Sequence, residues 1–437
     1  MTHRIWTLLS TVAGASLLAG AAFAADQAEA PPAAPASPPA AAAAAAPAAP
    51  TATSLPSMGA TLSGNTNPFN VDAGPLGKLY IGGAVTGLAF SQGNPVPGDH
   101  NSWADLSNGQ VFIQKADGLL QFYVQVGDYS LPALGTAYVK SSSQVPNTFG
   151  VVPLAYAKLA PNSWFSIIAG KIPGLIGAES TFTFQNMNIE RGLLWSQEPA
   201  ISQGVQANIN KGPLAFSVSL NNGFYSNRWN WITGSVGWTL NPRDTVTFAG
   251  GGSISSNPYV NTSTSYANTV NTATPLAQNN SQLYALSFTH TQGPFSITPY
   301  VQYSYAPAQP SIGIYSSASM IAGAVLAKYS FTPTISVAAR AEYESSSGGA
   351  SQCTNVPDVN GDGGSTTVCT PITNLLYGNG SNAFSITITP TYQYKIFFAR
   401  AEFSYTDIGN ITPGFGFGPE LAFTEQYRAM LETGILF

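Results

Sequence analysis

The chain has 437 residues, of which only 8% are charged, and its formal net charge is −5. Ordinary soluble domains carry about 25% charged residues, so this composition argues against a large water-exposed surface, and the slight acidity leaves no basic footprint for nucleic acid. Gly (43 residues), Phe (23) and Tyr (20) are abundant instead, which suits a membrane barrel with an uncharged outer band and aromatic girdles.

Residues 1–24 predict a secretory signal peptide. Arg4 precedes an apolar run from Leu8 to Ala22, and Ala22-Phe23-Ala24 supplies a small-residue cleavage site. The run is too short to span a membrane comfortably, and no later segment reaches about 18 uninterrupted apolar residues. We therefore expect an exported chain without a membrane helix.

Residues 25–76 predict a disordered periplasmic linker, because Ala and Pro dominate them up to about residue 60. Such a composition cannot bury a core and favours a partly extended chain. One interpretation is a spacer without activity. The alternative is a spacer that touches peptidoglycan or a partner.

Residues 77–437 predict an all-β fold, a transmembrane antiparallel up-and-down β-barrel of about 16 strands. After Gly77, segments of about ten residues alternate apolar and polar side chains. Seven tight turn signals occur, at 117–118, 161–162, 212–213, 242–243, 293–294, 332–333 and 394–395. Longer Ser/Asn/Gly-rich stretches alternate with them, at 93–107, 129–149, 174–199, 222–230, 254–280, 306–317, 346–381 and 407–423. Seven turns join 14 strands, and the first and last strands raise the count to 16.

The two faces of these segments differ in a way that favours a barrel over a soluble sandwich. In 214–221, Phe216 and Val218 lie on one face and Ser217 and Ser219 on the other. A soluble sandwich also alternates, but its water-facing side usually carries Lys and Glu rather than Ser, Thr, Asn and Gln. We expect the apolar rows to contact outer-membrane lipid and the polar rows to face a water-filled lumen.

The stretch 174–199 is a candidate constriction loop. It carries four charged residues among aromatic ones: Glu179, Glu190, Arg191 and Glu198. In wide barrels one long loop often folds into the lumen and sets the narrowest point. The sequence permits this arrangement without fixing it.

Motifs around this loop resemble the beta-barrel porin family known as type two (OmpL-like). They are Gly170-Lys171, Ile176-Gly177-Ala178-Glu179, Asn186-x-Asn188, Arg191-Gly192-Leu193-Leu194, Glu198-Pro199 and Gly204-Val205. The close match covers about forty residues, and the strand–turn rhythm extends the likeness over nearly the whole chain after residue 77. Members often have Ser before the Arg, where this chain has Glu190. The resemblance implies a passive outer-membrane porin and names no substrate.

The loop 346–381 contains both cysteines, Cys353 and Cys369, for which we expect a disulfide in an exported chain. Asp358, Asn360 and Asp362 match the first half of a calcium loop, but the twelfth position is Cys369 rather than Glu. We interpret this stretch as an external turn closed by the disulfide, with a weak calcium site as the alternative. No cofactor or metal is otherwise expected.

The strands near the C-terminus carry charges on the face opposite their aliphatic residues. They are Arg340, Glu342, Glu344, Arg400, Glu402, Arg428 and Glu432. An Arg that faces lipid at mid-depth costs roughly 2–4 kcal/mol, so we expect all of these residues to line the pore. Two interpretations remain open: a field that orients polar solutes, or ion pairs that brace neighbouring strands.

The chain ends on Phe437, which closes the last alternating strand and is typical of the insertion signal read by the barrel-insertion machinery. The sequence thus predicts a porin that passes small hydrophilic solutes through a Gram-negative outer membrane. The alternative is a surface adhesin or receptor that uses loops 254–280 and 346–381. An enzyme is not expected, because the mature chain keeps only His100 and His290, far apart. The solute, the ion preference and association into a homotrimer are left open.

Overall fold

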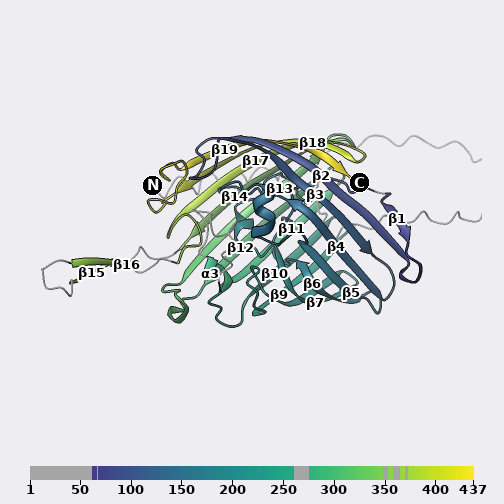
Figure 1. Cartoon of the computed structure of the whole chain (residues 1–437), viewed down its shortest axis with the longest axis horizontal. Helices are drawn as coiled ribbons and strands as arrows, with labels where there is room; N and C mark the ends of the chain where they lie inside the picture. The colour runs from purple at the N-terminus through teal and green to yellow at the C-terminus, as the bar shows by residue number, and fades with distance from the viewer. Residues whose placement is uncertain (1–61, 66, 260–274, 348–352, 358–364, 370–372) are drawn as a thin grey trace, which may run out of the picture. The chain divides into compact units, whose positions relative to one another are not determined.

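Sixteen antiparallel strands form a closed ring (Figure 1), which confirms the predicted barrel. The computed structural model describes residues 62–65, 67–259, 275–347, 353–357, 365–369 and 373–437, with backbone only at 353–357 and 365–369. The ring strands are β2 (Lys78–Gln92), β3 (Ser102–Lys115), β4 (Leu120–Tyr129), β5 (Leu154–Leu159), β6 (Phe165–Pro173), β7 (Ile201–Lys211), β8 (Leu214–Asn221), β9 (Trp231–Asn241), β10 (Asp244–Ser253), β11 (Gln282–Gln292), β12 (Phe295–Ala306), β13 (Ala318–Ser330), β14 (Ile335–Ser346), β17 (Asn382–Tyr394), β18 (Phe397–Gly409) and β19 (Glu425–Leu436). Each strand pairs with the next, β14 pairs with β17, and β19 pairs with β2 to close the ring.

Short turns and long loops alternate as predicted, so all turns lie at one end of the barrel and all loops at the other. Gly212 (φ 61°) and Gly293 (φ 56°) supply left-handed backbone at two of the turns, each directly before a proline. The largest difference in a boundary is at β3, which begins at Ser102, inside the predicted loop 93–107. The extra length of β3 includes a bulge, since Thr86 pairs with Asn108 but Gly87 pairs with Leu106.

The described end of the predicted linker lies against the turn end of the barrel. Residues 69–72 form β1 (Phe69–Asp72), which pairs with the first four residues of β2. Leu62 is 4% exposed and belongs to a cluster that includes Phe112 and Phe398. Ser63 and the side chain of Gln393 exchange two hydrogen bonds of 2.8 Å. The signal-peptide prediction and the rest of the linker lie outside the described residues.

A separate hairpin of β15 (Cys353–Pro357) and β16 (Ser365–Cys369) occupies part of loop 346–381. Its backbone register places Cys353 opposite Cys369, and the disulfide stays a prediction. The calcium-loop residues Asp358, Asn360 and Asp362 lie outside the described residues. Within the described chain, α2 (Ser141–Asn147) and α3 (Pro275–Asn279) are short, and no helix has the length and hydropathy to cross a membrane.

The barrel has an apolar outer face and a polar inner face. On β14 the outward Tyr343 is 51% exposed, whereas its inward neighbours Glu342 and Glu344 are 3% and 2% exposed. On β19 the outward Leu431 is 63% exposed and the inward Glu432 only 1%. This pattern is the inverse of a soluble domain and matches a barrel surrounded by hydrocarbon.

Candidate functional site

The long connection between β6 and β7, residues 174–200 and here called the inserted loop, lies inside the ring. Side chains and backbone groups of this loop bond to the inner faces of β3, β12, β14, β17, β18 and β19. A single loop can reach strands around so much of the ring only from within the lumen. Two 3-10 turns, η2 (Thr183–Gln185) and η3 (Leu194–Gln197), fold the loop locally.

Arg340 on β14 binds the inserted loop at two points. Its Nη1 lies 2.6 Å from Glu179 Oε1 and donates to the Glu190 carbonyl oxygen at 2.8 Å. Its Nε lies 3.1 Å from the carboxylate of Glu342, two residues along the same strand. Glu342 in turn accepts a hydrogen bond from the Leu193 backbone N–H at 3.1 Å. Arg340 and Glu342 of the barrel therefore hold the inserted loop at residues 179, 190 and 193.

Glu190 connects the inserted loop to two neighbouring strands, β18 and β19. Its carboxylate lies 2.5 Å from Arg428 Nη1 on β19 and accepts a hydrogen bond of 2.8 Å from the Ser404 hydroxyl on β18. Its backbone N–H and that of Ile189 donate to the two carboxylate oxygens of Glu402, at 2.9 and 2.5 Å. The side chain is fully buried, so these partners replace the hydration that the carboxylate has lost.

Arg400 and Glu432, on adjacent strands β18 and β19, form a third anchor. Their closest N–O distance is 2.6 Å, with both side chains fully buried. Arg400 also donates to the carbonyl oxygens of Thr183 and Asn186, at 2.7 and 3.0 Å. The Thr183 hydroxyl donates to Glu432 at 2.6 Å. The pair thus satisfies loop carbonyls that would otherwise be buried without a donor.

The charged residues predicted to line the pore all lie on the inner face, but six of them hold the inserted loop instead of facing open water. Arg340, Glu342, Arg400, Glu402, Arg428 and Glu432 are each at most 3% exposed. Glu344 also points inward, and its Oε2 makes no hydrogen bond within the described residues. Neither interpretation from the sequence, a solute-orienting field or strand-bracing ion pairs, anticipated this contact with the loop.

The remaining predicted loop residues are also buried. The guanidinium of Arg191 lies 5.3 Å from the Trp195 ring centre, and its backbone pairs with Ala133 of the preceding long loop. The Glu198 carboxyl contacts the Tyr300 hydroxyl on β12. Burial raises the pKa of Glu198 well above its ordinary value, which favours the uncharged acid. Burial also raises the pKa of Glu179, although the neighbouring Arg340 opposes this shift.

Asn108 on β3 is an uncharged residue that binds the inserted loop and gave no signal in the sequence. Asn108 Nδ2 donates to Thr183 Oγ1 at 2.7 Å and to Thr86 Oγ1 at 2.8 Å. Asn108 can reach the loop because the bulge in β3 turns both Ser107 and Asn108 inward. Only the paired register reveals this bulge.

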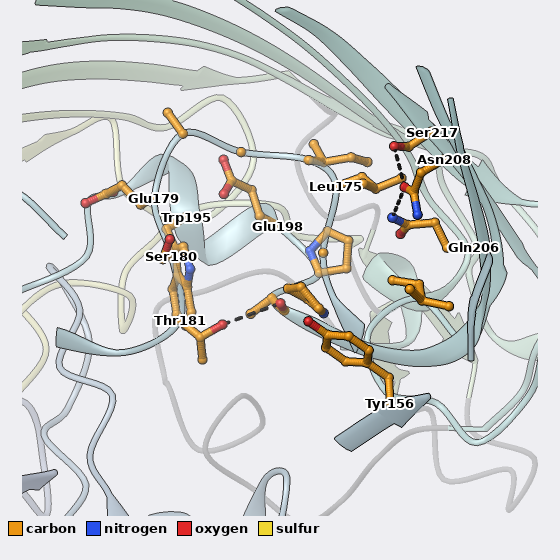
Figure 2. Close-up of a pocket in the computed structure, with 18 of the residues that line it drawn as sticks. Tyr156, Leu175, Glu179, Ser180, Thr181, Trp195, Glu198, Gln206, Asn208 and Ser217 are labelled. Carbon is orange, nitrogen blue, oxygen red and sulfur yellow. Dashed lines mark hydrogen bonds between the residues drawn. The ribbon is translucent and has the colours of Figure 1, made fainter. Parts of the chain in front are cut away.

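A cavity of about 450 Å³ separates the inserted loop from the inner faces of β5–β8 (Figure 2). The loop contributes Glu179, Trp195 and Glu198 on one side. The barrel contributes mostly uncharged polar side chains on the other: Tyr156, Lys158, Ser166, Gln206, Asn208, Asn210 and Ser217. The inserted loop thus contacts β3 and β12–β19, and space remains between it and β5–β8. Among the described residues, no cluster of His, Cys, Asp or Glu could hold a metal ion.

A family model described as "Putative beta-barrel porin-2, OmpL-like" matches residues 78–437. Solved structures with similar folds include three outer-membrane proteins. They are the anion-selective porin from Comamonas acidovorans (10% identity, TM-score 0.50, covering 82% of this chain and 99% of that chain), the outer membrane channel DcaP of Acinetobacter baumannii (11%, 0.51, 82% and 97%) and OmpF of Salmonella typhi in complex with daunomycin (13%, 0.51, 84% and 100%). At such identities the likeness concerns the fold alone. No curated protein matches the chain significantly.

Proposed function

The chain belongs to the OmpL-like family of beta-barrel porins, and from that membership we propose that it lets small hydrophilic solutes cross the outer membrane by passive diffusion. It is an outer-membrane porin of a Gram-negative bacterium, and its family favours a channel over an enzyme. The finer proposal is that solutes move along one side of the lumen, between the inserted loop and β5–β8.

The observation that carries this proposal concerns the inserted loop, whose charged contacts lie on one side of the lumen. Its charged anchors all lie on β14, β18 and β19. The inner face opposite them bears Ser, Asn and Gln side chains, which water can hydrate without a large electrostatic barrier. Sixteen-stranded barrels are wide enough to keep an aqueous channel beside such a loop.

Planar-bilayer recording with two neighbouring substitutions on β8 tests the path. Ser217 lines the cavity, and Val218 is 54% exposed on the outer face. We expect Ser217→Trp to reduce single-channel conductance by roughly half or more, because the indole would occupy part of the cavity that Ser217 lines. Val218→Trp should conduct like the wild type, because its indole contacts lipid.

Two outcomes would contradict the proposal. Wild-type protein that produces no conductance steps would refute a diffusion channel. Equal conductance of Ser217→Trp and the wild type, with both proteins correctly folded, would refute the path along β5–β8 but leave the channel itself in place.

A further inference from the structure

We propose that the cavity between the inserted loop and β5–β8 binds small hydroxylated organic anions, with Lys158 holding the anionic group and Gln206 accepting a hydrogen bond from a hydroxyl. This inference rests on the proposed function, because such a solute reaches the cavity by diffusing through the lumen. It adds a ligand class and two residues that select for it.

Lys158 supplies a positive charge that the protein leaves available. It lies on the inner side of β5, opposite Ile168 of β6, and is the single Lys or Arg among the described residues that line the cavity. No ion pair within the described chain engages it. An ammonium group in a partly enclosed aqueous site attracts anions more strongly than one on an open surface.

The two carboxyl groups of the cavity are already engaged elsewhere. Glu179 is paired with Arg340 at 2.6 Å, and the Glu198 carboxyl contacts the Tyr300 hydroxyl. Burial raises the pKa of Glu198, so the uncharged acid is favoured there. The lining is therefore acidic in composition, but its available charge is the ammonium of Lys158.

Gln206 supplies an acceptor that lacks a partner. Its Nε2 donates to Asn208 Oδ1 at 2.7 Å, and the Ser217 hydroxyl donates to the same oxygen at 2.8 Å (Figure 2). Gln206 is 7% exposed, and its Oε1 is buried without a hydrogen-bond partner among the described residues. A buried acceptor without a donor is unfavourable, and a hydroxyl group of a bound solute relieves this cost.

The remaining lining suits a short carbon chain. Tyr156 stacks on Tyr123, with ring centres 5.6 Å apart and planes at 26°, and its ring also lines the cavity. An aromatic ring packs well against C–H groups, whereas its hydroxyl tolerates water. A cavity of about 450 Å³ lies in the range that holds small-molecule ligands.

The test is block of the KCl current through the purified full-length protein in planar bilayers. Sodium gluconate is the hydroxylated anionic probe, and sorbitol is an uncharged polyol of the same carbon number. We expect gluconate to lower conductance at concentrations where sorbitol has no effect. Lys158→Gln should raise the half-blocking concentration roughly tenfold, and Gln206→Leu roughly fivefold, as expected for the loss of a charge-assisted or a neutral hydrogen bond.

Two further variants complete the design. Lys158→Arg keeps the charge and should retain most of the block. Lys211→Gln removes an exposed lysine at the turn end of β7, outside the cavity lining, and should be blocked like the wild type. Equal effects of gluconate and sorbitol, or unchanged block in Lys158→Gln, would overturn the inference. A wild-type protein that fails to conduct at all would refute the proposed function instead.

Discussion

Individual buried charges determine how firmly the inserted loop is held. Each anchor joins a guanidinium or carboxylate of the barrel to a loop group within about hydrogen-bond distance, and almost none of these atoms contacts water. Removing one partner of such a buried pair costs far more than the pair itself contributes, because the other charge is left without compensation. Substitutions at these positions therefore report directly on how stably the inserted loop is held in the lumen.

Arg340→Ala should lower the free energy of unfolding by about 3–5 kcal/mol, because Glu179 and Glu342 would stay buried without their cation. The urea midpoint of the heat-modifiable gel shift measures this loss. Arg243→Ala, on the exposed turn between β9 and β10, is the matched control and should stay within about 0.5 kcal/mol of the wild type. Equal midpoints for the two variants would contradict the role assigned to Arg340.

Glu198 should make stability depend on pH. Its folded-state pKa is raised above the ordinary value of 4.5, so between these two values the folded protein binds more protons than the unfolded chain. The free energy of unfolding should therefore fall as pH rises above 4.5. Glu198→Gln keeps the uncharged form and should flatten this decline, whereas Glu420→Gln, in an exposed loop, should not. Identical pH profiles for wild type and Glu198→Gln would contradict the prediction.

At the level of elements, local sequence signals predicted the strands and turns, and non-local contacts account for what was missed. Six of the seven turns contain Gly, Pro, Asn or Asp, whose chemistry acts over two to four residues, and the exception is the turn at Lys395. The seat of the inserted loop depends instead on partners such as Glu190 and Arg428, which are 238 residues apart. The inward face of Arg428 was predictable from alternation, but its contact with the loop residue Glu190 was not. The resemblance to the porin family, by contrast, is confirmed over residues 78–437.

One prediction at the level of elements concerns the hairpin of β15 and β16, which we expect a disulfide to close. Directly opposed residues on antiparallel strands have Cα atoms about 4.5–5.5 Å apart, a separation that a disulfide accepts. Cys353 and Cys369 are such a pair in the backbone register. We expect protein purified from membranes without reductant to resist alkylation by iodoacetamide and to gain two adducts after reduction, as measured by mass spectrometry. Two adducts before reduction would rule the disulfide out.

Across the whole molecule, the seam between β19 and β2 closes the barrel. The Phe437 backbone extends this seam by one residue, since it donates to the Gly83 carbonyl at 3.0 Å and accepts from the Gly83 N–H at 2.8 Å. Phe437 is thus the predicted insertion signal, and it is also the last hydrogen-bonded residue of the strand pair that closes the barrel. Chemical cross-linking in isolated outer membranes tests whether the protein associates into a homotrimer, which the sequence left open.

Deletion of Phe437 should reduce the amount of folded protein in the outer membrane several-fold, because both seam hydrogen bonds and the terminal aromatic ring are lost. Phe437→Tyr keeps the backbone and an aromatic ring and should assemble normally. The fraction that migrates as the compact form on unheated gels gives the yield. Equal yields for the deletion and the wild type would show that neither the ring nor the seam bonds limit assembly.

The position of the loop anchors has a consequence for biogenesis. Arg400, Arg428 and Glu432 belong to the final hairpin of the polypeptide, and Glu432 also accepts a hydrogen bond from Thr86 on the first ring strand. If the inserted loop were still outside the lumen when the last hairpin paired with β2, the closed barrel would already enclose the groups that bind the loop. The last hairpin must therefore arrive with residues 174–200 already folded beneath it, and loop-anchor variants should accumulate as open intermediates on the insertion machinery before they fail as channels.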